Sequence, residues 1–223
     1  MNEVRPGEMV TFLGVELETT ADVLVPREET ELLGRTAIGL LPPPTGEPVL
    51  VIDVCCGAGN LAAAIAVARP DVRVEATDLT DECVGLTRRN VDRLGLADRI
   101  GVHQGDLFEG LQTLGLEGRV DLVVCNPPYI STGKLDSESA HLLADQPREA
   151  FDAGPYGIGI HRRVARETPT LLRAGGWLAM EIGVGQYDQL AQLIDRSRRY
   201  DNTEVSRDRD GEPRVIAARR AAD

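Results

Sequence analysis

The chain has 223 residues, of which 36 are acidic and 24 are basic, so its formal net charge is -12 at pH 7. This acid surplus disfavours nucleic acid as a partner, because tight binding to a phosphate backbone needs a basic footprint. No apolar run approaches the ~18 residues of a membrane span, and the N-terminus lacks the pattern of a signal peptide. We therefore expect a globular, cytoplasmic chain without a membrane partner, whose main basic cluster is Arg196–Arg199.

The cysteines and histidines have no spacing that predicts a metal site or a disulfide. No Cys-x-x-Cys pair occurs among the four cysteines, and the three histidines are far apart in the chain. We expect no metal, and we interpret the cysteines as small apolar side chains in a reducing compartment. These residues are Cys55, Cys56, Cys83, Cys125, His103, His141 and His161.

A proline-rich segment, residues 41–48, interrupts the chain, because three consecutive prolines fit neither a helix interior nor a central strand. Before this segment, alternating apolar residues from Val10 to Leu17 predict a short hairpin, and residues 27–41 predict a helix with one apolar face. We therefore expect a leader, residues 1–45, that packs on a larger domain, residues 46–223.

After the prolines, apolar strand patterns alternate with helical patterns. This alternation predicts an α/β fold with a doubly wound, mainly parallel sheet of the Rossmann-like kind. A C-terminal hairpin brings the expected number of strands to seven. The expected strands are 49–53, 72–77, 100–103, 120–125 and 176–182, with the hairpin 204–206 and 214–217, and the expected helices are 60–68, 81–94, 158–172 and 187–196.

Ligands of such a sheet bind beyond the carboxyl ends of the strands, and the first strand ends in Asp53-Val-Cys-Cys-Gly57-Ala-Gly59. The glycines let the backbone turn sharply and approach a ligand. The helix that follows directs N–H groups and a partial positive charge toward that ligand. Asp53 either pairs with an amino group of the ligand or organises the loop.

Acidic residues follow the next two strands. Asp78 stands 19 residues after Gly59, where a carboxylate accepts two hydrogen bonds from a ribose diol. Asp106 follows the third strand, where it accepts a hydrogen bond from an adenine amine while Leu107 packs on the ring. These features predict a nucleoside site with the candidate residues Asp53, Cys55, Cys56, Gly57, Ala58, Gly59, Asp78, Leu79, Asp106, Leu107 and Asn126.

Two cofactors fit this pattern. The stretch from Gly57 to Ala62 also matches the dinucleotide fingerprint, so a dehydrogenase that uses NAD is one interpretation. Two features favour a sulfonium nucleoside instead. The carboxylate of Asp53 would repel a pyrophosphate, and the fourth strand leads into an unusual motif.

This motif is Asn126-Pro127-Pro128-Tyr129, and its two prolines make a stiff loop at the edge of the sheet. The Asn126 side-chain oxygen and the Pro127 carbonyl are two hydrogen-bond acceptors that suit a planar NH2 group. Tyr129 offers a flat face on which a planar amide or base packs. The motif therefore predicts transfer to an amide or amine nitrogen that is positioned by hydrogen bonds.

With these motifs, the sequence resembles the HemK/PrmC family of class I methyltransferases, which use S-adenosylmethionine to methylate the glutamine amide of the Gly-Gly-Gln motif in peptide chain release factors. The segment Val23-Leu-Val-Pro-Arg-Glu-Glu-Thr-Glu-Leu32 is similar to the family's "VLIPRPETEL", and Gly175–Gly183 to its fifth strand. The resemblance implies S-adenosylmethionine contacts at Cys55–Gly59, Asp78, Leu107 and Asn126, and glutamine contacts at Asn126–Tyr129. It covers nearly the whole chain.

Departures from the family pattern concern the acceptor. Few residues precede Pro26, so we expect the helical N-terminal domain of bacterial members to be absent. Short relatives without it act with a small partner protein, which makes such a partner an expectation here. Glu28 replaces a proline, and Gln146-Pro147 stands where the family has Glu-Pro. Arg27 and Tyr156 are further candidates for the acceptor cleft.

Three interpretations therefore stay open at this point. The first is methylation of a carboxamide, with a release factor glutamine first among acceptors and another protein or small-molecule amide after it. The second is methylation of the adenine amine in RNA or DNA, which uses a similar motif. The third is a non-catalytic subunit that binds the cofactor for a partner.

Overall fold

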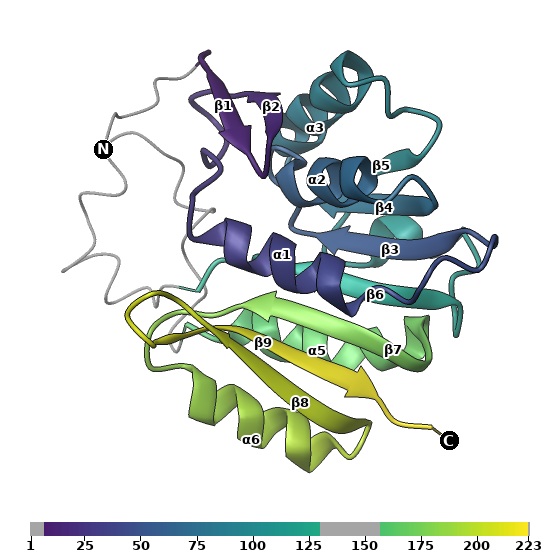
Figure 1. The fold of residues 1–223 in the computed structure, drawn as a ribbon, viewed down its shortest axis with the longest axis vertical. Helices are drawn as coiled ribbons and strands as arrows, with labels where there is room; N and C mark the ends of the chain where they lie inside the picture. Colours follow the sequence, from purple (N-terminus) through teal and green to yellow (C-terminus); the bar gives the residue numbers. More distant parts are fainter. Residues whose placement is uncertain (1–6, 130–156, 223) are drawn as a thin grey trace.

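The structure, a computed structural model, describes residues 7–129 and 157–222. Within these ranges strands and helices alternate along the chain, as Figure 1 shows. The strands are β1 (Met9–Phe12), β2 (Val15–Glu18), β3 (Val49–Val54), β4 (Val72–Asp78), β5 (Ile100–Gln104), β6 (Val120–Cys125), β7 (Leu172–Glu181), β8 (Tyr200–Arg207) and β9 (Pro213–Arg220). The helices are α1 (Thr30–Leu40), α2 (Asn60–Ala68), α3 (Asp81–Arg93), the 3-10 helix η1 (Glu109–Leu111), α5 (Gly159–Leu171) and α6 (Tyr187–Ser197).

In the described part of the chain, seven strands form one sheet in the order β5-β4-β3-β6-β7-β9-β8. The first five strands of this order run parallel, and β9 runs antiparallel to both β7 and β8. Strand order reverses between β3 and β6, which is where ligands of doubly wound sheets bind. The predicted α/β fold with its seven-stranded, mainly parallel sheet is therefore confirmed.

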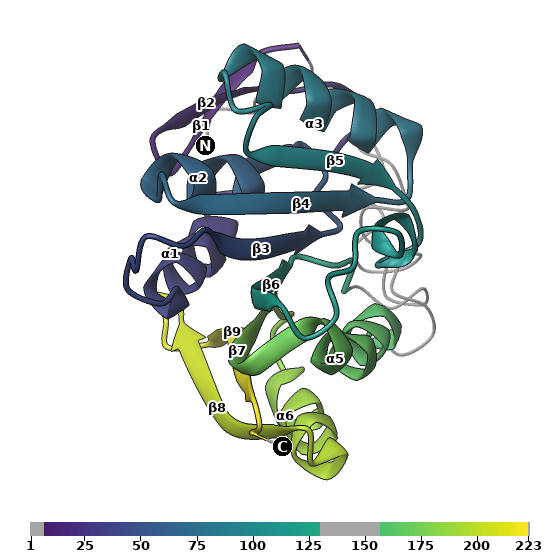
Figure 2. The ribbon, with the colours of Figure 1, turned by 90° about the vertical axis from the view of Figure 1, so that its right-hand side faces the viewer.

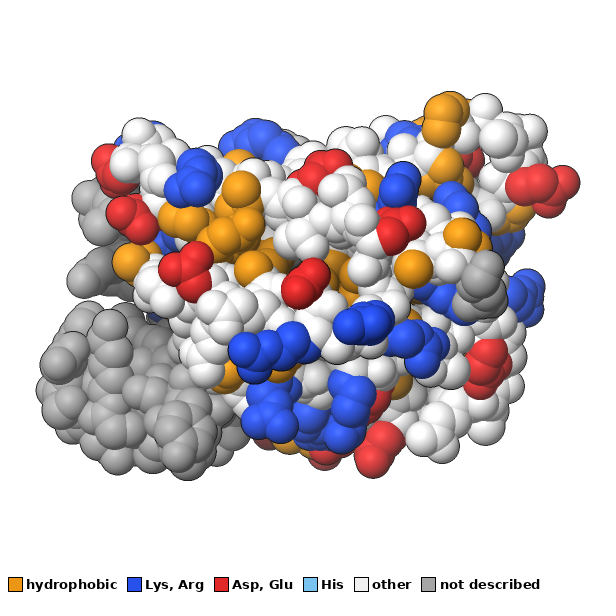
Figure 3. All heavy atoms as spheres, turned by 90° about the horizontal axis from the view of Figure 1, so that it is seen from below, with side chains coloured by type: hydrophobic (Ala, Val, Ile, Leu, Met, Phe, Trp, Pro, Cys, Tyr) orange, Lys and Arg blue, Asp and Glu red, His pale blue; other side chains and the backbone are white. Residues whose placement is uncertain are grey.

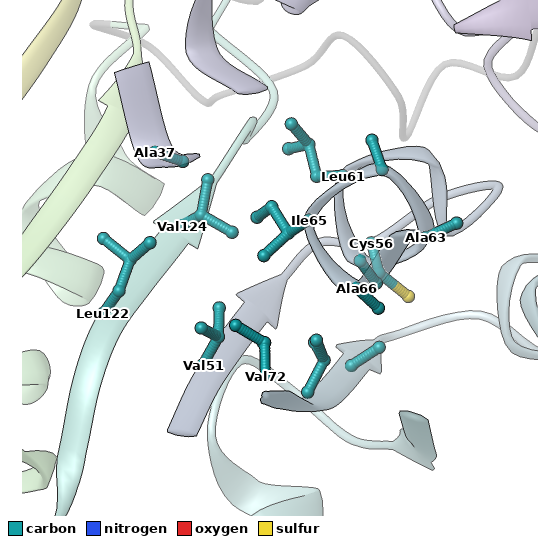
Figure 4. Packing of buried hydrophobic residues seen from close by; sticks show 14 of the residues in the cluster. Ala37, Val51, Cys56, Leu61, Ala63, Ile65, Ala66, Val72, Leu122 and Val124 are labelled. Atoms are coloured by element: carbon teal, nitrogen blue, oxygen red, sulfur yellow. The ribbon is translucent and has the colours of Figure 1, made fainter. Parts of the chain in front are cut away.

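Helices cover both faces of the sheet. Figures 1 and 2 show α1, α2 and α3 on one face and α5 and α6 on the other. Each face has its own apolar core, and α2 contributes to the first with six buried residues, most of them alanine. Figure 4 shows this helix over β3, β4 and β6, where Ile65 lies near Val51 and Val124. Small side chains let α2 lie close to the sheet, so its first turn stands directly over the end of β3.

The leader joins this first face of the sheet. β1 and β2 form the predicted hairpin, and their residues Phe12 and Leu17 are buried in the same core as α2. Helix α1 contacts both β6 and β7. We therefore keep, as a proposal, the division into a leader of residues 1–45 and a domain of residues 46–223.

Several boundaries differ from the sequence prediction, and the starts of α1 and β7 have a clear physical reason. Helix α1 begins at Thr30 and not at residue 27, because the chain from 27 to 32 first forms overlapping four-residue turns; the Thr30 N–H donates to the Arg27 carbonyl at 3.1 Å. β7 begins at Leu172 and not at residue 176, because a register shift opposite Val120 and Leu122 of β6 accommodates Gly175 and Gly176 within the strand. The 3-10 helix η1 was not predicted.

The basic cluster Arg196–Arg199 lies at the C-terminal end of α6. Because α6 starts beyond the carboxyl end of β7 and runs back along the sheet, this end lies opposite the ligand-binding edge. Figure 3 shows arginine side chains gathered on the side of the molecule where α6 lies, among acidic and apolar side chains. None of the described helices has the length and apolar composition that crossing a bilayer requires.

Candidate active site

A cavity of about 760 Å³ opens at the carboxyl ends of the parallel strands. This volume lies in the range of ligand pockets, ~300–1,000 Å³. Residues that follow β3, β4, β5 and β6 line it, so the strand ends and loops converge as the fold prediction required. The predicted site residues in its wall are Cys55, Gly57, Asp78, Leu79, Asp106, Leu107, Asn126 and Pro128.

The turn after β3 has a backbone that side chains rarely adopt. Cys55, Gly57 and Gly59 all have positive φ values, of 59°, 56° and 76°. The Cys56 N–H donates to the Thr77 carbonyl at 3.1 Å, which ties the turn to β4. A non-glycine residue in the left-handed region stores strain, and Cys55 carries it at the cavity wall. Cys56 and Ala58 are buried behind that wall.

Gly59 is the position in this turn where a side chain is least tolerable. A Cβ there would lie 2.8 Å from Thr87 Cγ2, and the Thr87 hydroxyl donates to the Gly57 carbonyl at 2.9 Å. We expect Gly59→Ala to lower the free energy of unfolding by about 1–3 kcal/mol, from backbone strain and overpacking. Urea denaturation measures this. Gly39→Ala in α1, with open space around its Cβ, should instead stabilise by up to about 1 kcal/mol; equal effects of the two substitutions would refute the steric argument.

Asp78, at the end of β4, organises the same turn. Its Oδ2 accepts from the Gly57 N–H at 2.9 Å, and its Oδ1 accepts from the Leu79 N–H at 2.8 Å. Burial raises the pKa of Asp78 above its usual value, and these hydrogen bonds oppose that rise. The carboxylate therefore joins the turn after β3 to the turn after β4 while it faces the cavity.

Asp53 has no exposed surface and does not line the cavity. Its Oδ2 accepts from the Ala62 N–H at 2.9 Å, in the first turn of α2. Of the two sequence interpretations, the structure places the side chain where it organises the loop. One of the α2 N–H groups expected to face the ligand is thus already bound by the protein.

The burial of Asp53 makes stability depend on pH. Desolvation raises its pKa from 3.8 to about 7, so the folded state keeps a proton that the unfolded state loses above pH 3.8. Stability from this group is therefore fully present below about pH 4 and is lost as the pH rises to about 7, at about 1.4 kcal/mol per pH unit. In urea titrations, Asp53→Asn should gain stability relative to the native chain over this window. Asp98→Asn, which replaces an exposed aspartate, should show no such gain. If the stability of Asp53→Asn changed with pH in parallel with that of the native chain, Asp53 would not be the group responsible.

Asp106 and Leu107 follow β5. Both Asp106 oxygens accept from Arg163 of α5, at 3.0 and 2.9 Å. Leu107 is buried at 5% exposure, with a φ of 55° that turns it into the cavity wall. The Arg163 pair was not predicted, and it means that an adenine amine would share the carboxylate with a guanidinium.

The Asn126–Tyr129 motif follows β6 directly. Asn126 lines the cavity, and its side-chain Nδ2 donates to Thr30 Oγ1 at 3.1 Å. Pro127 is buried and Pro128 lines the cavity. Gln186, at the start of α6, donates from Nε2 to the Tyr129 carbonyl at 2.8 Å and accepts from the Gly183 N–H with Oε1 at 2.8 Å. The loop is therefore held at both of its ends by side chains from other elements.

Several site residues were missed by the sequence prediction. The leader supplies part of the cavity wall, and α3 and α5 supply more. Val23 lies in the segment that resembles the family motif, and this was the one available signal for it. The missed lining residues are Asp22, Val23, Leu24, Thr77, Thr80, Glu82, Cys83 and Ile160.

Arg27 and Tyr156 were the two further residues predicted for the acceptor cleft, and the structure describes only the first of them. Arg27 is partly buried outside the cavity lining, and its charge acts on the Tyr129 hydroxyl. Tyr156, like Gln146 and Pro147, lies outside the described residues. The roles of these residues, and of the other candidate site residues, stay predictions.

Residues 40–180 match the family model described as the methyltransferase small domain. The chain is 32% identical over 208 residues to a release factor glutamine methyltransferase of Geobacter sulfurreducens, covering 93% of this chain and 69% of that protein. The chain belongs to the release factor glutamine methyltransferase family. A second member of this family, from Moorella thermoacetica, is 34% identical, with 94% of this chain and 71% of that protein covered.

A solved structure of this methyltransferase family agrees with the fold. It is a protein-(glutamine-N5) methyltransferase from Alicyclobacillus acidocaldarius, 26% identical, with a TM-score of 0.51 over 89% of this chain and 95% of that chain. The resemblance first read from Asn126–Tyr129 and the Val23–Leu32 segment is therefore confirmed. As a family member, this chain is a methyltransferase, and the dehydrogenase interpretation is set aside.

Proposed function

We propose that this chain transfers a methyl group from S-adenosylmethionine to the side-chain amide nitrogen of glutamine, in the Gly-Gly-Gln motif of a peptide chain release factor. The observation that carries the proposal is the position of Asn126. Asn126 lines the same cavity as Asp78 and Leu107, so an acceptor amide held by Asn126 would meet a cofactor held by the strand ends.

The donor set of the cavity fits S-adenosylmethionine. The Asp78 carboxylate lines the cavity and is the type of acceptor that binds a ribose diol. Its Oδ2 accepts from the Gly57 N–H, and its Oδ1 accepts from the Leu79 and Thr80 N–H groups. Leu79 and Leu107 offer apolar surface for the faces of an adenine ring. The backbone at Cys55 and Gly57 approaches the cavity without a long side chain between. These residues would hold the cofactor.

The protein's part in the reaction is to hold the acceptor nitrogen. When bound, S-adenosylmethionine supplies an electrophilic methyl group on a sulfonium. A carboxamide nitrogen is a poor nucleophile because its lone pair is delocalised into the carbonyl. The Asn126 side-chain oxygen and the Pro127 carbonyl take one N–H each and draw electron density onto that nitrogen. Positioning of this kind contributes up to ~7–11 kcal/mol in favourable cases.

The cysteines in the cavity wall are consistent with direct transfer of the methyl group from the cofactor to the acceptor nitrogen. A hydrogen bond with Cys125, together with burial, raises the pKa of Cys55 well above its usual value. Burial raises the pKa of Cys83 to about 12. Both thiols therefore stay protonated and unreactive near neutral pH, so the proposal needs no covalent intermediate on the enzyme.

Incubation with methyl-labelled S-adenosylmethionine tests the proposal. We expect label on a release factor that carries Gly-Gly-Gln, and none on the same factor with that glutamine replaced by alanine. Peptide mass spectrometry should place one added methyl group on the glutamine side chain. Two outcomes would overturn the proposal. In parallel incubations with RNA or DNA, label on adenine would favour the amine methyltransferase. Cofactor binding without transfer to any of these acceptors would favour a non-catalytic subunit.

A further inference from the structure

The orientation of the Asn126 carboxamide decides whether this side chain can accept a hydrogen bond from the NH2 group of an acceptor amide. A carboxamide has an oxygen that accepts and an NH2 group that donates, and the two ends have nearly the same shape. Only the oxygen can take a hydrogen from an acceptor amide; the NH2 end would face another NH2 group. Something in the protein must therefore fix which end of Asn126 faces the cavity.

Thr30 contacts the amide end of this side chain. It is the first residue of α1 and is 3% exposed. Its Oγ1 lies 3.1 Å from Asn126 Nδ2. A hydroxyl both donates and accepts, so this contact fixes the carboxamide only if the threonine hydrogen is bound elsewhere.

Glu181 supplies the acceptor for that hydrogen. It ends β7, next to β6, where Met180 pairs with Cys125, so it stands beside Asn126 at the sheet edge. Its side chain is 3% exposed and its Oε2 has no hydrogen-bond partner among the described residues. The side chains of Thr30 and Tyr129 act on this carboxyl and oppose the rise in its pKa that burial causes.

An ionised carboxylate only accepts hydrogen bonds. Thr30 must then donate its hydroxyl hydrogen to Glu181, and its oxygen is left to accept from Asn126. The hydrogen bonds would then run in one direction, from Asn126 Nδ2–H to the Thr30 oxygen, at 3.1 Å, and from the Thr30 hydroxyl hydrogen to the Glu181 carboxylate. The Asn126 oxygen is left for the cavity.

We propose that Thr30 and Glu181 are positioning residues, which hold the Asn126 carboxamide with its oxygen toward the acceptor. This inference rests on the proposed function, and it gives the Thr30 position of the leader segment a specific task. The same carboxyl acts on the Tyr129 hydroxyl: burial raises the pKa of Tyr129, and the charge of Glu181 adds to that rise, so one buried side chain influences both ends of the motif.

The groups around Glu181 act on its carboxyl in opposite directions. Burial raises the pKa of Glu181 above its usual value and Glu29 adds to the rise, while the Thr30 and Tyr129 side chains and the charge of Arg214 in β9 oppose it. His161 of α5 hydrogen-bonds the Glu181 backbone carbonyl through Nε2 at 2.8 Å. This bond fixes the backbone and leaves the carboxylate to Thr30 and Tyr129.

Three substitutions separate positioning from folding. Thr30→Val keeps the shape and loses the hydroxyl, and we expect its kcat to fall by about 10- to 100-fold, as for a misplaced catalytic contact. Thr30→Ser keeps the hydroxyl and should retain most of the kcat. Thr36→Val, in the same helix but bound to Leu32 and Ser206, should leave kcat unchanged. S-adenosylmethionine affinity, measured by calorimetry, should be equal in all four proteins.

A spectrum of the cofactor-free protein tests the same point without activity. With asparagine labelled by 15N, the Asn126 side-chain signal is assigned by its loss in Asn126→Ala. We expect this signal to shift in Thr30→Val, which lacks the hydroxyl. It should also shift in Glu181→Gln, because a glutamine side chain can donate to Thr30 and reverse the direction of the hydrogen bonds. In Thr30→Ser the signal should keep its position.

An unmoved signal together with full kcat in Thr30→Val would overturn the positioning role. Failure of the native chain to methylate any carboxamide is a different result. It would reject the proposed function, while the spectrum would still report whether Thr30 orients Asn126.

Discussion

Replacing Asn126 by alanine should lower the methyl-transfer rate by about 10²- to 10³-fold, the loss seen when one preorganised hydrogen-bonding group is removed from an active site. The substitution removes the oxygen that grips the acceptor and leaves Thr30 Oγ1 without its partner at 3.1 Å. Single-turnover kinetics with saturating cofactor measure this loss directly. Cofactor affinity should change much less, because the ribose and adenine groups meet other residues.

Asn202→Ala is the matched control for this substitution. Asn202 lies in β8, and its side-chain Nδ2 donates to Oε1 of the exposed Glu204 at 3.2 Å. We expect unchanged transfer in that variant. If Asn126→Ala also turned over at the native rate, the acceptor would have to be held by other groups.

Replacing Asp78 by alanine should weaken S-adenosylmethionine binding by about 100-fold or more. Two hydrogen bonds from a ribose diol to a carboxylate contribute about 1.5–3 kcal/mol each, and every 1.4 kcal/mol is a factor of ten in Kd. The alanine also removes the acceptor for the Gly57 and Leu79 N–H groups. Calorimetric titration with the cofactor gives the affinity.

Asp78→Asn separates these two effects. The amide keeps one oxygen for the Gly57 N–H but loses the charge, so we expect an affinity between those of the native chain and Asp78→Ala. Asp92→Asn, on the exposed side of α3, controls for the loss of one negative charge. An Asp78→Ala protein that binds the cofactor with native affinity would remove Asp78 from the site.

Much of the fold could be predicted because the sheet is buried on both faces. Its strands contain apolar runs such as Leu122–Cys125, and the glycines and prolines between the strands mark the connections. The start of β7 could not be predicted, since a pair of glycines is compatible with either a break or a bulge. Only pairing with β6 decides between them.

In the candidate site, too, some residues could be predicted from the sequence and others could not. Residues at strand ends, such as Asp78 and Asn126, were found because the topology alone puts them at one edge. Contacts between elements distant in sequence were not found. Thr30 lies 96 residues from Asn126, and Arg163 lies 57 residues from Asp106. Such pairs depend on how helices pack against the sheet, and no local pattern in one sequence records that.

The most direct test of the central claim is a crystal structure with S-adenosylhomocysteine and a peptide that contains Gly-Gly-Gln. The account predicts that the glutamine Nε2 lies within hydrogen-bond distance, about 2.7–3.2 Å, of both Asn126 Oδ1 and the Pro127 carbonyl oxygen. It also predicts that Asn126 Nδ2 stays on Thr30. A glutamine bound elsewhere, or an Asn126 carboxamide turned so that its nitrogen faces the peptide, would contradict the account.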